Sequence, residues 1–149
     1  MTINAVYIIY NGVCLVSRQY NEKYNTKDHL LSAFISAIDS FAKEFSNKEL
    51  KRLVLEDDIF SFSKIDDVIF VFTHDNVKNS KLESLSNKVS RKFFEFYKSE
   101  LKNWNSDVSI FESFENELDT IIDSKGKSVL LDMENFLQNQ KKKRLEQKK

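Results

Sequence analysis

The run VIFVFT at residues 68–73 constrains the fold more than any other part of the sequence. Its side chains are apolar or β-branched at consecutive positions, whereas a strand with one face in water alternates apolar and polar residues. A strand of this kind is buried on both of its faces. The sequence therefore predicts a sheet that is covered by helices on two sides.

A second constraint comes from Asn11-Gly12, which lies between two strand-like segments, Val6–Tyr10 and Val13–Arg18. Both segments are rich in β-branched and aromatic residues. Asparagine and glycine adopt the positive backbone angles that a two-residue type I′ turn requires. We therefore expect a tight β-hairpin near the beginning of the chain.

Helical periodicity follows this hairpin. Apolar residues recur at intervals of three and four, which predicts a helix of about 19 residues capped by Thr26, with the whole stripe facing the core. Three more strands are expected at Leu50–Leu55, Ile59–Phe62 and Val68–Thr73, joined by the polar turns EDD and SKIDD. The residues of the helical stripe are Leu30, Leu31, Phe34, Ile35, Ile38, Phe41, Ala42 and Phe45.

Two further helical stripes follow the strands and should form the second layer. The first runs from Leu82 to Trp104 and the second from Phe111 to Ile122, and a last helix is expected over about residues 127–145. The predicted class is α+β, an α/β/α sandwich around a five-stranded, mainly antiparallel sheet. Its order is β-β-α-β-β-β-α-α plus a C-terminal helix.

Composition narrows the class further. Proline is absent, glycine occurs twice and phenylalanine occurs 13 times, so loops should be short and most of the chain should lie in regular elements. The 23 basic and 23 acidic residues give a formal net charge of zero, so no global field draws the protein to nucleic acid. Any electrostatic partner must bind locally.

Compartment signals are few. Cys14 is the single cysteine, which excludes an intramolecular disulfide and suits a reducing compartment. No apolar run approaches the roughly 20 residues of a membrane-spanning helix, and the N-terminus lacks the pattern of a signal peptide. We therefore expect a soluble, cytoplasmic protein.

A family resemblance rests on four stretches and on the order of the elements. The stretches are AVYIIYNGVCLVSRQY (5–20), LLSAFISAIDSFAKEF (30–45), DDVIFVFTHD (66–75) and NWNSDVSIFESFENELDTII (103–122). They resemble the longin and roadblock group of profilin-like domains, in particular longin-type domains of archaeal lineages that carry many small GTPases. The resemblance implies a longin-like domain over residues 1–123, followed by a C-terminal helix with a basic tail at residues 124–149.

The same resemblance implies a function. Domains of this group are non-enzymatic scaffolds that dimerise and bind or regulate a small Ras-like GTPase or a vesicle-trafficking complex. The hairpin Val6–Arg18 and the helix Leu30–Phe45 would build the platform for such a partner.

The segment KGKS at residues 125–128 is similar to the end of a phosphate-binding loop. That motif requires a glycine five residues before Gly126, and the residue there is Ile121, on the apolar face of a predicted helix. A turn between two helices, with Gly126 as the C-cap, is therefore the preferred interpretation.

Other candidates for chemistry have simple structural explanations. Cys14 and His74 could form a catalytic pair if their strands are neighbours, but a thiol that faces the core is a small hydrophobe with nothing to attack. His29 and His74 lack the ligand spacing of a structural zinc site. The acidic groups Glu56-Asp57-Asp58 and Asp66-Asp67 are typical of solvated turns. We therefore expect no catalytic residue, metal or cofactor.

The C-terminal end is strongly basic, because six cations oppose only Glu146 and give about +5 over nine residues, which leaves about −5 on the rest of the chain. One interpretation is a solvated, fraying helix end. The other is peripheral contact with an anionic membrane or an acidic partner, at roughly 1 kcal/mol per basic residue. Nucleic acid is a weaker option, because no aromatic residue is interleaved for stacking. The six cations are Lys141, Lys142, Lys143, Arg144, Lys148 and Lys149.

The apolar face of the last predicted helix carries Met133, Phe136 and Leu137. One helix on one side of the sheet and two on the other already cover it, so we predict that this face mediates self-association or binds a partner. An uncovered edge strand would offer a second route.

A small-molecule sensor of the wider profilin-, PAS- or GAF-like architecture is the alternative function. Such a sensor needs a pocket with a few convergent polar groups. The polar residues that the predicted strands offer are chiefly Ser61, Ser63, Thr73, Tyr7 and Tyr10.

Overall fold

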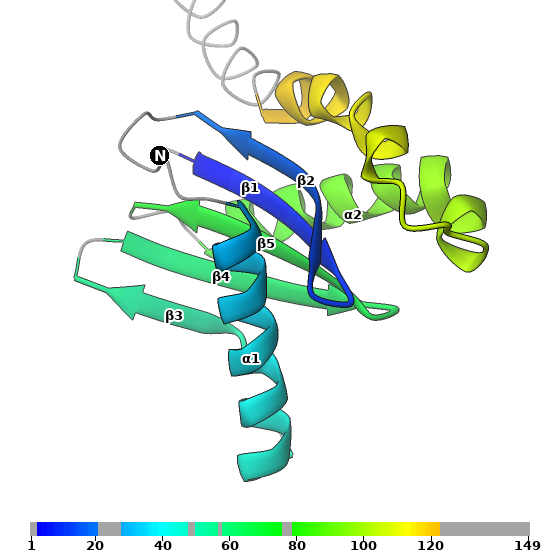
Figure 1. Ribbon diagram of the computed structural model, residues 1–149. Coiled ribbons are helices and arrows are strands. Elements are labelled where there is room, and N and C mark those ends of the chain that lie inside the picture. The colour runs from blue at the N-terminus through cyan, green and yellow to red at the C-terminus, as the bar shows by residue number, and fades with distance from the viewer. Residues whose placement is uncertain (1–2, 21–27, 48–49, 57, 76–78, 123–149) are drawn as a thin grey trace, which may run out of the picture.

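A computed structural model describes residues 3–20, 28–47, 50–56, 58–75 and 79–122. A five-stranded antiparallel sheet lies at its centre, in the order β2-β1-β5-β4-β3, with helices on both sides (Figure 1). The predicted α+β class and the five-stranded sheet are confirmed. The strands are β1 (Ile3–Tyr10), β2 (Val13–Gln19), β3 (Arg52–Leu55), β4 (Asp58–Ile65) and β5 (Val68–His74).

The two central strands, β1 and β5, are the most buried elements. Every residue of β5 is buried, and so is every residue of β1 before Tyr10. Val6 lies opposite Phe72, and Ile8 lies opposite Phe70, so β-branched and aromatic side chains pack as cross-strand pairs. The inference from VIFVFT is confirmed, because this strand is covered on both faces.

Two tight hairpin turns lie at the same end of the sheet (Figure 1). Asn11 and Gly12 have φ values of 49° and 77°, as a type I′ turn requires. The β4–β5 turn is shorter than the predicted SKIDD, because Ser63–Ile65 continue β4 and only Asp66 and Asp67 turn, with φ values of 49° and 66°. Aspartate tolerates this left-handed backbone better than most residues do.

One face of the sheet is covered by α2 (Asn79–Lys102), by the 3₁₀ helix η2 (Val108–Phe111) and by a helix that begins at residue 114. Phe93 of α2 is fully buried, and its ring lies 5.4–5.9 Å from the rings of Phe70, Phe111 and Phe114. The two stripes predicted over residues 82–104 and 111–122 therefore do form one layer. Phe111, however, lies in η2 and not in the following helix.

The other face carries the single helix α1 (Asp28–Ser46), which has the predicted length of 19 residues. Its Leu31 and Ile35 are buried against β1 and β5. The prediction that its whole apolar stripe faces the core is wrong, because about half of the stripe is exposed. Figure 1 gives the reason: α1 crosses the strands, and its C-terminal half continues beyond β3, where no sheet lies beneath it.

Several predicted boundaries change. β3 begins at Arg52 and not at Leu50, and β4 extends beyond Phe62 to Ile65. Thr26, the expected helix cap, and the expected C-terminal helix lie outside the described residues. Within the part of the chain that is described, no helix combines the length and the apolarity that crossing a membrane requires.

Candidate interaction surface

Most of the exposed large apolar side chains in the described residues belong to α1 and to the neighbouring edge strand β3. On α1 the exposed fraction rises to 65% at Phe41 and 79% at Phe45, and these two rings stack on each other with centroids 5.5 Å apart. The stacking covers only part of each ring, and most of the apolar surface of both side chains stays in contact with water. We call the exposed set the α1 stripe; it consists of Leu30, Phe34, Phe41 and Phe45.

The α1 stripe lies beside the buried face of the helix and not opposite to it. At 3.6 residues per turn, the apolar positions of α1 span an arc of about 140°. Leu31 and Ile35 lie at one end of this arc and contact the sheet, while the α1 stripe occupies the other end. A single contact with a sheet needs an arc of only about 100°. The apolar arc of α1 is therefore wider than one contact with the sheet needs. This extra width is the signal in the sequence for a second contact surface.

The edge strand β3 extends this surface. β3 pairs with β4 on one side and with no described strand on the other. Val54 and Leu55 of β3 are 56% and 52% exposed. Leu55 shares the α1 face of the sheet with Leu53, and Val54 points to the opposite face. An open edge with apolar side chains presents unpaired N–H and C=O groups to another strand. Helix α1 and the edge strand β3 lie on the same side of the molecule (Figure 1).

The opposite edge strand of the sheet, β2, is tied by side chains to the helix that begins at residue 114. Arg18 of β2 donates two hydrogen bonds to the carboxylate of Asp119, at 2.9 and 2.7 Å, and Tyr20 donates a third at 2.9 Å. Burial alone would raise the pKa of Asp119, but the hydrogen bonds from Arg18 and Tyr20 lower it below its ordinary value. This network holds the helix that begins at residue 114 against β2, so the two sheet edges differ.

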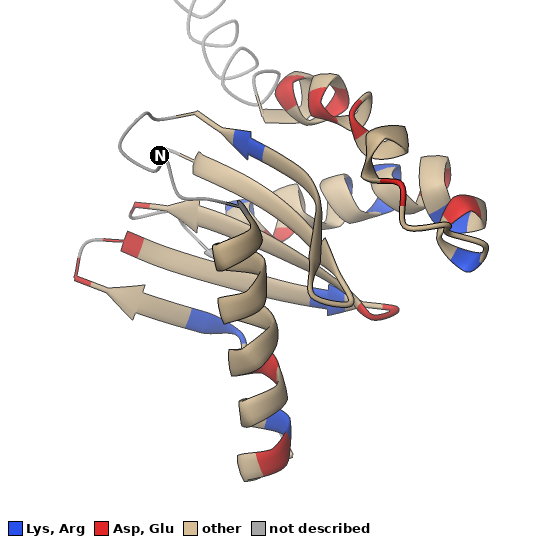
Figure 2. Ribbon diagram, in the orientation of Figure 1, with Lys and Arg blue, Asp and Glu red and all other residues tan. Residues whose placement is uncertain are grey.

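An ion pair fixes the position of α1 on the sheet. Asp39 of α1 lies 3.0 Å from Lys64 of β4, and both side chains are largely buried. Lys43 approaches the same carboxylate at 3.9 Å. Residues 29–38 of α1 contain no Lys, Arg, Asp or Glu, so the part of α1 above the sheet is uncharged (Figure 2). The α1 stripe is therefore presented by a helix that is held in place by charge and by packing.

Cys14 and His74, considered above as a pair only if their strands were neighbours, lie on strands that are not adjacent. Cys14 lies opposite Ile9, while His74 lies opposite Ile3 at the far end of β1, and β1 separates the strands of the two residues. Cys14 is half-buried, and its thiol donates to the carbonyl of Val16 at 3.3 Å. No nucleophile–base pair is formed by these two residues.

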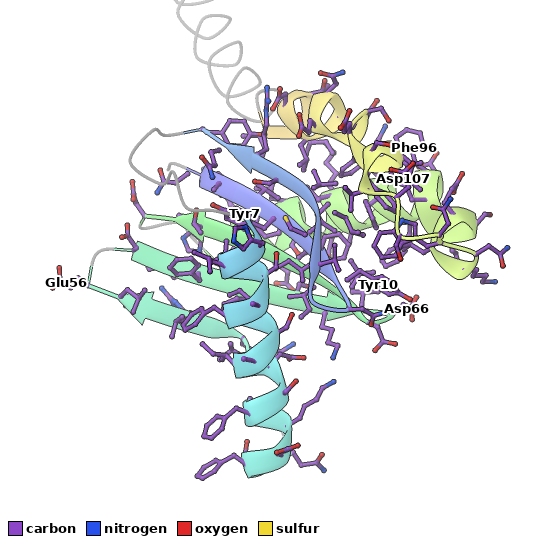
Figure 3. The ribbon with its side chains drawn as sticks, viewed as in Figure 1. Tyr7, Tyr10, Glu56, Asp66, Phe96 and Asp107 are labelled. Atoms are coloured by element: carbon purple, nitrogen blue, oxygen red, sulfur yellow. The ribbon has the colours of Figure 1, made fainter. Side chains whose placement is uncertain are left out.

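Of the acidic groups, Glu56, Asp66 and Asp67 lie at turns, as expected, whereas Asp58 is the first residue of β4. Glu56 and Asp66 occupy the tips of two connections at opposite ends of the sheet (Figure 3), and Asp57 lies outside the described residues. Among the residues that the structure describes, no three His, Cys, Asp or Glu side chains gather as metal ligands do.

The predicted C-terminal sites also lie outside the described residues. This applies to the KGKS segment, to the apolar face with Met133, Phe136 and Leu137, and to the basic residues between Lys141 and Lys149. The roles assigned to them, in self-association and in contact with an anionic membrane or an acidic partner, stay predictions.

Comparison with known proteins bears on the fold. No family model matches the chain, and no curated protein matches it. Among solved structures, MglB from Myxococcus xanthus is similar, with a TM-score of 0.51 over 65% of this chain and 85% of that chain, at 17% sequence identity. The fold is longin-like. At this identity the likeness concerns the fold alone, and it agrees with the resemblance seen in the sequence.

Proposed function

We propose that the protein is a non-enzymatic interaction module that self-associates through the α1 stripe and the β3 edge and that binds a small Ras-like GTPase. The observation that carries the first part is the exposed α1 stripe beside an open strand edge. The second part is supported by the resemblance of the sequence to longin and roadblock domains and by the longin-like fold shared with MglB.

A second copy of the chain is the occupant that suits this surface. In a two-fold dimer the same patch serves both partners, so a helix can pack on its own copy while an edge strand pairs with its own copy in the antiparallel sense. Both elements lie on one side of the molecule (Figure 1), so one symmetry axis serves both. Phe41 and Phe45 would supply the aromatic contacts that are enriched at interface cores.

The oligomeric state tests this self-association. The full chain should show twice the monomer mass in light scattering, and the double variant Phe41→Glu with Phe45→Glu should show the monomer mass. Val108→Glu is the matched control, because Val108 is also an exposed apolar residue but lies on the α2 side. This control should leave the mass unchanged.

A chain that ends at residue 124 separates this surface from the predicted C-terminal one. We expect the truncated chain to remain a dimer. If the truncated chain is a monomer and the Phe41→Glu/Phe45→Glu variant is a dimer, self-association depends on the C-terminal segment and the α1 stripe is not the interface.

GTPase binding needs its own experiment. The full chain should be mixed with each small GTPase of the same genome, loaded with GDP or with a non-hydrolysable GTP analogue. We expect a complex in size exclusion, or a changed rate of nucleotide exchange or hydrolysis, with at least one of them. No complex and no rate change with any of these GTPases would contradict this part of the proposal and leave the self-association result intact.

A further inference from the structure

The α2 side of the sheet is not covered to its edge. The buried cluster on this side draws its strand residues from β1, β2 and β5, and β4 contributes only the partly buried Ile65. Ser61 and Ser63 of β4, and Arg52 opposite Ser61, point to this side because Phe60 and Phe62 point to the other. A pocket of about 400 Å³ lies here, between β4 and the first turns of α2. Its volume is in the range of small-molecule sites.

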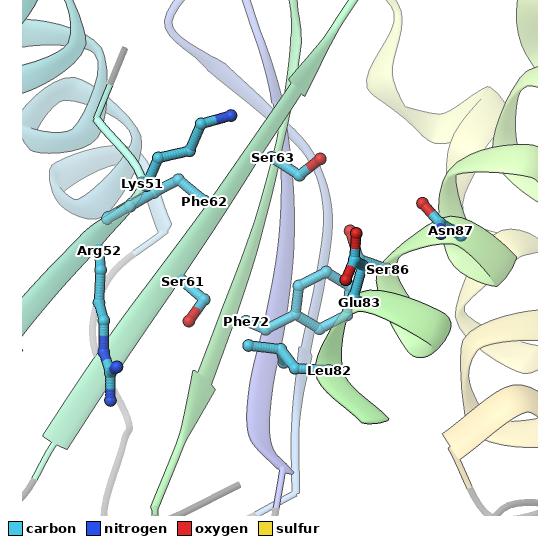
Figure 4. Close-up of a pocket in the computed structure, with 10 residues that line it drawn as sticks. All are labelled: Lys51, Arg52, Ser61, Phe62, Ser63, Phe72, Leu82, Glu83, Ser86 and Asn87. Atoms are coloured by element: carbon cyan, nitrogen blue, oxygen red, sulfur yellow. The ribbon is translucent and has the colours of Figure 1, made fainter. Parts of the chain in front are cut away.

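The pocket has walls of different chemistry (Figure 4). Arg52, Ser61 and Ser63 lie on the strand wall, and Glu83, Ser86 and Asn87 lie on the α2 wall, with the apolar Phe72 and Leu82 between them. Ser61 and Ser63, two of the polar strand residues named above for a small-molecule sensor, therefore both line this pocket.

Arg52 and Glu83 lie on opposite walls of the pocket, and both residues are exposed; Lys51 is the third charged residue of the lining. Within the described part of the chain, neither Arg52 nor Glu83 has an ion-pair partner, and the two are not paired with each other. A cation on one wall and a carboxylate on the other fit a ligand that carries both charges.

A hydrogen-bond chain fixes what Ser61 can do. His74 Nδ1 lies 2.7 Å from the carbonyl oxygen of Asp75, which can only accept, so this nitrogen carries the proton. Burial lowers the pKa of His74, so at pH 7 its Nε2 is an acceptor, and the hydroxyl of Ser61 donates a hydrogen bond to it at 2.7 Å. The oxygen of Ser61 can then accept a hydrogen bond from a ligand in the pocket.

We propose that this pocket binds a small zwitterion of the amino-acid type, with its carboxylate on Arg52 and its ammonium group on Glu83 and the oxygen of Ser61. Arg52 is a donor only, while Glu83 and the oxygen of Ser61 are acceptors, so the lining offers a partner to each end of such a ligand. The site shares Arg52 with the β3 edge but contains no residue of the α1 stripe, and ligand binding does not require self-association, so this inference does not rest on the proposed function.

Thermal unfolding of the full chain tests the proposal. Each of the twenty free amino acids is added at about 10 mM, because a ligand that binds only the folded state raises the midpoint. At least one amino acid should raise it in a saturable way, and its N-acetyl and amide derivatives should not. If no amino acid raises the midpoint, or if a blocked derivative binds as well as the free amino acid, the proposal is wrong.

Variants then assign the residues. Calorimetric titration with the best amino acid should show that Arg52→Gln and Glu83→Gln each weaken binding at least tenfold without lowering the midpoint of the free protein. Glu95→Gln, an exposed acid on α2 outside the pocket, is the matched control and should bind as the parent does. Equal affinity in Arg52→Gln, Glu83→Gln and the parent would place the ligand elsewhere and overturn the assignment.

Discussion

The phenylalanines of the helices differ in burial between the two faces of the sheet. On the α2 side, Phe93, Phe111 and Phe114 are fully buried around Phe70 of β5. On the α1 side, the phenylalanines of the helix are 49–79% exposed. The α2 side has three helical segments and buries this aromatic cluster, with Phe96 alone of its helix phenylalanines among the exposed residues, whereas the α1 side has one helix.

This difference separates the residues that stabilise the fold from those that are available to a partner. A buried aromatic side chain contributes through the area that it removes from water and through its ring contacts. An exposed one contributes little to the monomer and retains most of its apolar area for a partner. We therefore expect substitutions on the α2 side to change folding and substitutions in the α1 stripe to change association.

Phe93→Ala should produce the largest loss of stability. Phe93 is fully buried, and its ring contacts those of Phe70, Tyr97 and Phe114, so truncation leaves a cavity at the centre of the α2 side. The expected loss in the free energy of unfolding is about 3–5 kcal/mol, measured by urea denaturation. A loss of less than 1 kcal/mol would show that the α2 side is not the closed core described above.

Gly12→Ala should destabilise the α1 side through the backbone. An added Cβ would lie 3.8 Å from Ser36 Oγ of α1, which is ordinary contact, so space is not the cause. The φ of 77° is the cause, because a residue with a side chain rarely adopts it, and the cost is about 1–2 kcal/mol.

The matched control for Gly12→Ala is its neighbour in the same turn. Asn11 has a φ of 49°, which glycine adopts without strain, so Asn11→Gly should keep the turn and cost far less in urea denaturation. Equal losses for the two variants would show that the positive φ of Gly12 is not what matters.

Asp119→Asn should lower the free energy of unfolding by about 1 kcal/mol. The substitution weakens the link between β2 and the helix that begins at residue 114. The charged pair with Arg18 has good two-bond geometry, but Arg18 is 41% exposed and water screens much of the attraction. Arg18→Gln should give a similar loss, and the double variant should lose less than the sum, because the two residues interact directly.

The same carboxylate predicts a pH dependence. The pKa of Asp119 is lower in the folded than in the unfolded chain, so the unfolded chain binds the proton more readily. The stability that Asp119 contributes is therefore complete above its unfolded pKa of about 3.9 and is lost as the pH falls through the folded value. The difference in unfolding free energy between the parent and Asp119→Asn should shrink as the pH falls from 6 towards 3.

Much of the fold could be predicted from the sequence because its signals are local. Consecutive apolar residues fixed β5 as a central strand, and Asn11-Gly12 fixed the first hairpin, since both depend only on neighbouring residues. The direction in which α1 crosses the sheet could not be predicted, since it depends on packing between distant elements. For this reason the helical periodicity places Phe41 and Phe45 on the core face, although both are exposed.

The pocket could not be predicted for the same reason. Ser61 and Ser63 were recognised as polar strand residues, but Arg52 and Glu83 come together only because α2 begins beside β4. Their separation in the sequence carries no pattern that would link them. Charges on different elements become a site only when the topology is known.

Phe41→Ser should have the smallest effect on the stability of the monomer. It therefore tests the contrast between the two faces of the sheet most directly. Phe41 is 65% exposed, so its replacement should change the free energy of unfolding by no more than about 0.5 kcal/mol at protein concentrations where the chain is monomeric. At higher concentrations the parent should gain stability, because association favours the folded state, and the variant should not. Urea denaturation at several protein concentrations therefore separates the two contributions in one experiment. A loss of 2 kcal/mol or more at the lowest concentration would mean that Phe41 packs within its own chain, and the contrast between the two faces would then disappear.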